Sequence, residues 1–326
     1  MRGMIRCSLV LCMILLAVAI RQALHNSSGL SSSQLGGLAT RTNMSHAKPY
    51  TDSIEVFNQP LKQGVKIPRI GLGVFQSAPG PETEEAVACA LQEGYRHIDT
   101  AALYRNEASV GAAIRNSGIP REEIFVTTKL WNSDHGYQQT LQAFQRSLVN
   151  LGLEYVDLYL VHSPMRVDKR LETWKAMETI LKSGRARSIG VSNYGIHHLE
   201  ELFANCTIRP SVNQVELHPY HTRTVLVDFC KRNGIALQAY SPLTKGRRLK
   251  DPALQEIAHR YHKTPAQLLL RWGLQKGFIV LPKSVTPQRI LQNIQVTDFE
   301  ISAADMAQLD SFNENLATGW DPTTGA

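Results

Sequence analysis

Apolar and polar residues alternate along most of the chain in two different periods. From Ile54 onward, short runs of apolar and β-branched residues are separated by longer segments in which apolar residues recur every three or four positions. The short runs predict buried strands, and the longer segments predict amphipathic helices. Eight runs are predicted strands: 70–74, 97–100, 124–129, 156–162, 188–192, 212–216, 236–240 and 278–281. Ahead of them, residues 54–57 and 65–67 flank a turn that contains Gly64 and predict a short N-terminal β-hairpin.

The segments between the strands predict the fold. The clearest helices span 81–93, 137–151, 171–183, 222–233 and 252–261. In the second of them, Leu141, Phe144 and Leu148 fall on one face, as in a helix that packs on a core. Strict alternation of strands and helices predicts a parallel sheet of the α/β class, and eight such units predict closure into a (β/α)8 TIM barrel. A doubly wound open sheet is the alternative.

The first 51 residues differ in composition from the rest. Residues 7–20 form an uninterrupted, mostly apolar run with arginine on both flanks. At 14 residues, this run is shorter than the roughly 20 that a membrane-spanning helix needs. We therefore predict three parts: a hydrophobic leader over 1–24, a polar, serine-rich and disordered linker over 25–51, and one barrel domain over 52–326.

The use of the leader decides the location of the protein. A signal peptide fits the short run and the small residues at 17 and 19, and an uncleaved anchor would place the protein at a membrane through this segment alone. A mitochondrial presequence is an alternative, because the stretch up to Pro49 is rich in serine and lacks acidic residues. Translation from Met44 would bypass the leader and leave the protein in the cytoplasm.

Charge and cysteine content exclude several classes of protein. The formal charge is +7, but five cations precede Asp52, the first acidic residue, and the remainder carries +2. This balance gives no basic stripe for nucleic acid. The cysteines beyond the leader, Cys89, Cys206 and Cys230, are too widely spaced for a disulfide framework or a zinc site. We expect a monomer without bound metal.

Polar side chains end three consecutive predicted strands. Asp99, Lys129 and His162 stand at these ends, and Tyr104 follows shortly after the first of them. Barrel enzymes carry their working residues at the carboxyl ends of the strands, so we expect these four side chains to meet. In contrast, the glycines at 71 and 73 are followed by Gln76 instead of a third glycine, and we interpret them as a tight turn rather than a pyrophosphate loop.

The four residue types suit proton transfer to a carbonyl group that accepts a hydride. A tyrosine hydroxyl can protonate the oxygen if its pKa of about 10 is lowered toward neutrality. The ammonium of Lys129 would lower it, and Asp99 would keep that lysine charged and oriented. His162 would donate a hydrogen bond to the carbonyl oxygen.

The segments that carry these residues resemble motifs of the aldo-keto reductase family. Residues 94–104 (GYRHIDTAALY) are similar to the first family signature, 128–131 (TKLW) to the segment with the family's lysine, and 160–164 (LVHSP) to the one with its histidine. The resemblance runs from about Ile54 to the C-terminus. Its closest branches are the prostaglandin F synthases, glyoxal reductases and 2,5-diketo-gluconate reductases. It implies NADPH-dependent reduction of a small aldehyde or ketone to an alcohol.

The resemblance also implies a cofactor site along the rim of the barrel. Ser192, Asn193 and Gln214 would hold the nicotinamide amide, on which Tyr240 would stack. The remaining cofactor residues would be Gly73, Val74, Asp99, Ser241, Leu243, Lys283, Ser284, Arg289, Gln292 and Asn293. The cations among them predict a preference for NADPH, which carries one more phosphate than NADH.

Substrate contacts are assigned to His162, Trp131 and Phe75, with Trp320 as a further candidate. Many relatives have tryptophan where this chain has Ser163, so one aromatic wall of the pocket is absent or supplied elsewhere. The loop over 244–250 is short, which predicts an open pocket. The alternative function is a non-catalytic NADP(H)-binding module of the same fold, but such a module has no need of the tyrosine and lysine together.

Overall fold

The computed structural model describes residues 46–325 and contains a parallel eight-stranded barrel. The barrel strands are β3 (Leu72–Gly73), β4 (His97–Asp99), β5 (Phe125–Leu130), β6 (Val156–Val161), β7 (Ala186–Ser192), β8 (Val212–Glu216), β9 (Ala236–Tyr240) and β10 (Ile279–Leu281). They lie in sequence order, and every neighbouring pair is parallel. Parallel bridges from Ile70 to Val280 and from Gly73 to Lys283 join the two edges. The predicted (β/α)8 barrel is confirmed.

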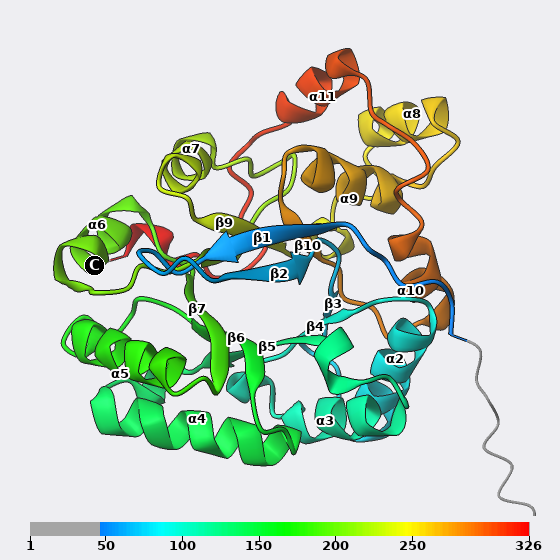
Figure 1. The fold of residues 1–326 in the computed structure, drawn as a ribbon. Coiled ribbons are helices and arrows are strands. Elements are labelled where there is room, and N and C mark those ends of the chain that lie inside the picture. The colour runs from blue at the N-terminus through cyan, green and yellow to red at the C-terminus, as the bar shows by residue number, and fades with distance from the viewer. Residues whose placement is uncertain (1–45, 326) are drawn as a thin grey trace, which may run out of the picture. The chain divides into compact units, whose positions relative to one another are not determined.

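Helices surround the barrel, as the ribbon in Figure 1 shows. They are α2 (Pro81–Gln92), α3 (Glu107–Asn116), α4 (Tyr137–Leu151), α5 (Arg170–Lys182), α6 (Ile196–Asn205), α7 (Thr224–Arg232), α8 (Pro252–Arg260), α9 (Pro265–Gln275), α10 (Pro287–Ile294) and α11 (Ala303–Asp310). Proline stands in the first turn of α2, α8, α9 and α10, where its missing N–H leaves no hydrogen bond unmade. The apolar faces of the helices pack on the strands and form the main core.

The N-terminal hairpin covers one end of the barrel. Its strands are β1 (Ser53–Phe57) and β2 (Gly64–Pro68), which pair antiparallel and cross the front of the barrel in Figure 1. Val56, Val65 and Ile67 form a second apolar cluster with residues of the barrel strands. Because the hairpin occupies the end where these strands begin, the carboxyl ends of the strands are left for a functional site.

The predicted bounds of the strands are close to the observed ones, with one clear exception. The run predicted over 70–74 contains a strand of only two residues, Leu72–Gly73. The cause is the closure of the barrel, because Ile70 pairs across the seam with Val280 and Gly71 donates its N–H to the Val280 carbonyl. Strands β8 and β9 match the prediction at both ends, and the remaining strands differ from it by at most two residues at either end.

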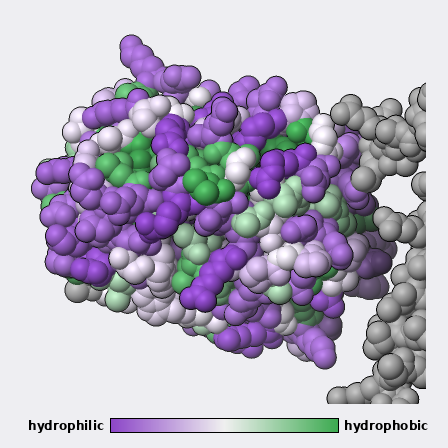
Figure 2. Space-filling model, turned by 90° about the horizontal axis from the view of Figure 1, so that it is seen from below, coloured by the Kyte–Doolittle hydropathy of each residue, from purple (hydrophilic) through white to green (hydrophobic). Residues whose placement is uncertain are grey.

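The predicted leader and most of the predicted linker lie outside the described residues. Near the start of the described part, the backbone N–H of Ala47 donates to the Gln92 carbonyl at 2.7 Å, at the end of α2. Within residues 46–325, no helix combines the length and the apolar character needed to span a bilayer. The face shown in Figure 2 is mainly hydrophilic, with hydrophobic residues in small patches. Cys89, Cys206 and Cys230 are free thiols.

Candidate active site

A cavity of about 840 Å³ lies at the carboxyl ends of the barrel strands. Strands β3, β4, β7, β9 and β10 each contribute their last residue to its wall, and β8 contributes Gln214. The predicted site residues that line it are Gly73, Phe75, Asp99, Tyr104, Trp131, His162, Ser192, Asn193, Gln214, Tyr240, Ser241, Leu243, Lys283, Ser284, Arg289, Gln292, Asn293 and Trp320. Parallel strands end at one rim, and this brings together residues that are far apart in the sequence.

Lys129 lies behind the cavity wall and connects two of the predicted catalytic residues. Its ammonium donates to Asp99 Oδ1 at 2.6 Å, to the Thr100 carbonyl at 2.8 Å and to the Tyr104 hydroxyl oxygen at 3.4 Å. The lysine side chain is fully buried, so all three donors have an acceptor where water is excluded. Since Lys129 donates to the phenol oxygen, the hydroxyl proton of Tyr104 is left to point elsewhere, toward the cavity.

Tyr104 belongs to a short turn that follows β4. The 3-10 helix Ala102–Tyr104 ends at Arg105, whose left-handed backbone (φ 58°) terminates the turn. The tyrosine ring lies against Phe75, with centroids 5.0 Å apart, and against His162 at 5.7 Å. The turn thus places the hydroxyl above the buried lysine and beside the histidine.

Burial sets the protonation state of this tyrosine. Loss of water contact raises the pKa of Tyr104 well above its usual value, and the nearby Asp99 carboxylate raises it further. Lys129, which we expected to lower this pKa toward neutrality, does not outweigh these two effects in the described residues. The charge of Lys129 is offset by Asp99 at 2.6 Å, while burial lowers the pKa of Lys129 itself. The phenol therefore keeps its proton at neutral pH, which is the state that a general acid requires.

His162 is neutral in this environment. Burial lowers its pKa well below the usual value, and the charges of Lys129 and His135 lower it further. Its ring stands edge-on to Trp131, with centroids 5.1 Å apart, and its Nδ1 is buried without a hydrogen-bond partner in the described part of the chain. Nε2 is therefore the ring nitrogen that can form a hydrogen bond with a ligand in the cavity. A neutral imidazole can orient an oxygen by one hydrogen bond, but it is a poor proton donor.

The ends of β7, β8 and β9 form a polar network beside these residues. Asn193 Nδ2 donates to the His162 carbonyl at 3.0 Å, and the Tyr240 hydroxyl donates to Asn193 Oδ1 at 2.9 Å. Gln214 Nε2 donates to the second carboxylate oxygen of Asp99 at 2.8 Å. Asn193 has a left-handed backbone (φ 61°), a conformation that is uncommon for residues other than glycine but that asparagine adopts more readily than most. The network ties the predicted nicotinamide residues to the predicted catalytic ones.

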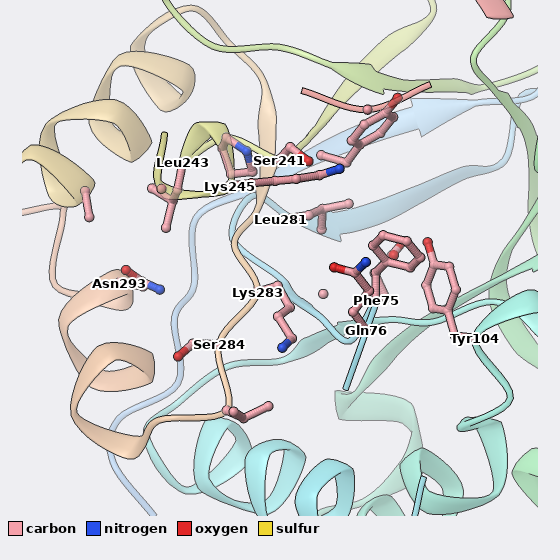
Figure 3. A pocket seen from close by; sticks show the side chains of 18 of the residues that line it. Phe75, Gln76, Tyr104, Ser241, Leu243, Lys245, Leu281, Lys283, Ser284 and Asn293 are labelled. Atoms are coloured by element: carbon pink, nitrogen blue, oxygen red, sulfur yellow. The ribbon is translucent and has the colours of Figure 1, made fainter. Parts of the chain in front are cut away.

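The donors in the cavity fit a nicotinamide dinucleotide. The aromatic ring of Tyr240 and the amide groups of Asn193 and Gln214 lie at the strand ends, where a flat amide-bearing ring could be held. Farther along the cavity, Lys283 and Ser284 lie near the start of α10, as Figure 3 shows, and Arg289 belongs to that helix. Cations and hydroxyl donors at this end match the phosphates of such a ligand.

Some predicted residues lie elsewhere, and some lining residues were missed. Val74 does not line the cavity, because its side chain is buried in the main core while Phe75 faces the pocket. Ser163, which stands where many relatives have tryptophan, is also buried and donates to Asn132 Oδ1 at 2.7 Å. The aromatic wall of the cavity is supplied by Trp131 and Trp320 instead. Lys245 lines the cavity but was not predicted. The sequence feature that could have indicated Lys245 is its position two residues after Leu243, a predicted cofactor residue.

The closed parallel barrel, with the hydrogen-bonded Asp99, Lys129 and Tyr104 and the adjacent His162 ring at its carboxyl end, defines a (β/α)8-barrel enzyme. The chain belongs to the aldo-keto reductase family: the model of the "Aldo/keto reductase family" matches residues 69–314. The protein is thus an oxidoreductase that acts on carbonyl compounds with a nicotinamide cofactor.

Individual relatives support the same family over almost their whole length. The chain is 50% identical to a 9,11-endoperoxide prostaglandin H2 reductase of Trypanosoma cruzi, over 80% of this chain and 93% of that protein. It is 48% identical to a glyoxal reductase of Bacillus subtilis, over 80% and 95% respectively. Among solved structures, the Bombyx mori aldo-keto reductase in complex with NADP has a TM-score of 0.76 at 39% identity, and the match covers 85% of this chain and 96% of that one.

Proposed function

We propose that the protein reduces an aldehyde or ketone to an alcohol with NADPH, and that Tyr104 is the general acid. The observation that carries this proposal is the contact of the Tyr104 hydroxyl with the buried Lys129–Asp99 pair at the cavity wall, beside His162. A cofactor site alone would not need this arrangement, since a buried ion pair stabilises a fold only weakly.

The four residues divide the work of carbonyl reduction. When bound, the nicotinamide supplies the hydride that adds to the carbonyl carbon. His162 donates a hydrogen bond to the carbonyl oxygen and fixes its position. Tyr104 gives its proton to the same oxygen as negative charge develops there, and the ammonium of Lys129 stabilises the phenolate that remains. Asp99 holds Lys129 in place through the 2.6 Å contact.

A preference for NADPH over NADH follows from the cations near α10. Lys283 and Arg289 are exposed cations on the cavity wall, and Ser284 is a buried hydroxyl between them in the sequence. Arg289 can contact a phosphate through two parallel N–H donors, while Lys283 acts as a point charge. These groups favour the cofactor with the additional phosphate.

The alternative, a module that binds NADP(H) without turnover, is tested directly. The protein produced from Met44 is mixed with NADPH and, in separate assays, with methylglyoxal, an aromatic aldehyde, phenanthrenequinone and a prostaglandin endoperoxide. The names of the relatives motivate the first and last substrates. We expect NADPH oxidation with at least one of these carbonyls. NADPH binding without oxidation by any of them would instead support the binding module.

A further inference from the structure

The C-terminal segment, residues 318–325, places Trp320 on the wall of the cavity. The indole is 52% exposed and makes no hydrogen bond or aromatic ring contact within residues 46–325. Gly319, directly before it, also lines the cavity and has no side chain that could support the ring. The position of Trp320 therefore depends on how the rest of the segment is fixed.

The first anchor of this segment lies ahead of Trp320. Glu216, the last residue of β8, is buried and accepts from the backbone N–H of Thr318 with both carboxylate oxygens, at 3.0 and 3.1 Å. The Thr318 hydroxyl donates to the same carboxylate. Gln214, on the same strand, donates to Asp99 at 2.8 Å. One strand thus connects the candidate catalytic residues to the start of the C-terminal segment.

The second anchor follows Trp320 and is made by one arginine. Arg223 directly precedes α7 and has a left-handed backbone (φ 45°), which is uncommon for a residue other than glycine. Its guanidinium donates to the Glu216 carbonyl at 3.0 Å and to the Thr323 hydroxyl at 2.8 Å, and Nη2 lies 2.8 Å from Asp321 Oδ2. The arginine side chain is only 9% exposed, so water competes little for these contacts.

The partners of Arg223 are fixed in turn. Asp321 Oδ1 accepts from the Thr323 N–H at 3.1 Å and from the Thr323 hydroxyl at 2.7 Å. On its other side, the Thr323 carbonyl approaches the backbone just before α6, where a Cβ atom added to Gly195 would lie 2.0 Å from the carbonyl oxygen. Figure 1 shows this end of the chain beside α6. The segment is thus fixed on both sides of Trp320, and the indole is left to contact a ligand.

We propose that Arg223 is a positioning residue, which holds Trp320 at the wall against which the apolar part of a carbonyl substrate packs. Its guanidinium joins the end of β8, a strand of the predicted nicotinamide site, to the segment that carries the indole. A buried ion pair adds little net stability, so its main effect here is on the direction of this segment. The proposal rests on the proposed function, because it assumes that a carbonyl substrate occupies the cavity.

Hydrogen exchange tests the position of the segment without turnover. Backbone amide exchange is followed by mass spectrometry in the wild type, Arg223→Met and Arg232→Met. Arg232 is the exposed last residue of α7 and forms no ion pair in the described part of the chain, so its variant controls for loss of charge from the same helix. Arg223→Met should exchange faster in residues 318–325 and as slowly as the wild type in the barrel strands. Arg232→Met should match the wild type throughout.

Substrate kinetics test the contact with the indole. KM and kcat are compared at saturating NADPH for phenanthrenequinone, whose rings can pack on Trp320, and for methylglyoxal, which has no ring. Arg223→Met should raise the KM of the quinone about three- to tenfold, the range of a lost aromatic contact. The kcat for the quinone, the KM of methylglyoxal and the Kd of NADPH should not change. In a Trp320→Ala background, where the indole is absent, Arg223→Met should add nothing further.

Two results would overturn the proposal. One is an exchange rate in residues 318–325 that Arg223→Met leaves unchanged, and the other is a KM effect of the same size with and without the indole of Trp320. If Arg223→Met does not fold, Asp321→Asn removes the charge of the more exposed partner, and the same results are expected of it. A protein that reduces neither carbonyl would contradict the proposed function, while the exchange rates would still decide whether Arg223 fixes the segment.

Discussion

At the scale of single residues, charge in the cavity is arranged in two zones. The catalytic zone holds the buried Lys129–Asp99 pair, whose charges offset each other, together with the neutral side chains of Tyr104 and His162. The cofactor zone holds exposed cations, of which Arg289 is one. We propose that the first zone moves a proton and that the second attracts an anion.

Arg289→Ala should weaken NADPH selectively. The variant loses a charge-assisted hydrogen bond, and because the side chain is exposed we expect the smaller end of the usual range, about 1.5 kcal/mol or roughly a tenfold higher Kd for NADPH. NADH, which lacks the additional phosphate, should bind as before. Titration of both cofactors against the variant, with Arg247→Ala as an exposed control in another loop, measures the effect. Equal losses for the two cofactors would show that Arg289 does not contact that phosphate.

The sequence predicts the position of site residues better than their protonation state. Asp99, Lys129 and His162 were found because each follows an apolar run, and parallel strands end at one rim. The raised pKa of Tyr104 depends on how completely water is excluded from it, and no pattern along the chain records that. Lys245 was missed for a related reason: its direction depends on left-handed backbone angles in its loop.

At the scale of secondary structure elements, α3 and α4 approach each other unusually closely. The contact is made by Gly111 in α3 and the carbonyl of Leu151 at the end of α4. A Cβ atom added to Gly111 would lie 1.9 Å from the Leu151 oxygen and 2.6 Å from its carbonyl carbon. Because the clash is with backbone, a side-chain rotation cannot relieve it, and the two helices would have to separate.

Gly111→Ala should therefore destabilise the protein, against the usual trend. In an open helix interior the same substitution is stabilising by about 1 kcal/mol. Here we expect overpacking to reverse the sign and to leave the variant about 1–3 kcal/mol less stable. Urea unfolding of the wild type and the variant measures the difference, and Ala108→Gly at an exposed position of α3 calibrates propensity in the same helix. A variant as stable as the wild type would mean that α3 and α4 do not touch at this point.

The period of the apolar residues was sufficient to predict all eight barrel strands and the hairpin. The ends of a strand were predicted less well where hydrogen bonding to a distant partner strand determines them. At 70–74 the pattern extends over five positions, but the seam between β3 and β10 leaves only Leu72–Gly73 as a strand. The partner that closes a barrel is more than 200 positions away, so a local pattern cannot specify the register there.

At the scale of the whole molecule, we propose that the N-terminal segment determines the cellular location of the barrel. The apolar run over 7–20 is flanked by arginine and is the basis for the predicted leader. Fused to a fluorescent reporter, residues 1–43 should direct it to the secretory pathway or to a membrane, as seen by microscopy and fractionation. Replacing two leucines of the run by aspartate is the control and should abolish this targeting. A diffuse cytosolic signal from the unaltered fusion would favour translation from Met44.

We propose that the protein reduces a carbonyl group with Tyr104 as the acid. The most direct test is the rate of NADPH oxidation in a single turnover, with enzyme in excess over cofactor and with an aldehyde that the wild type reduces. Tyr104→Phe removes the hydroxyl with little change in volume, so the dissociation constant of NADPH should stay within about twofold. We predict a loss in rate of about 10²–10⁴-fold, as for removal of other general acids. An oxidation rate close to that of the wild type would contradict the account.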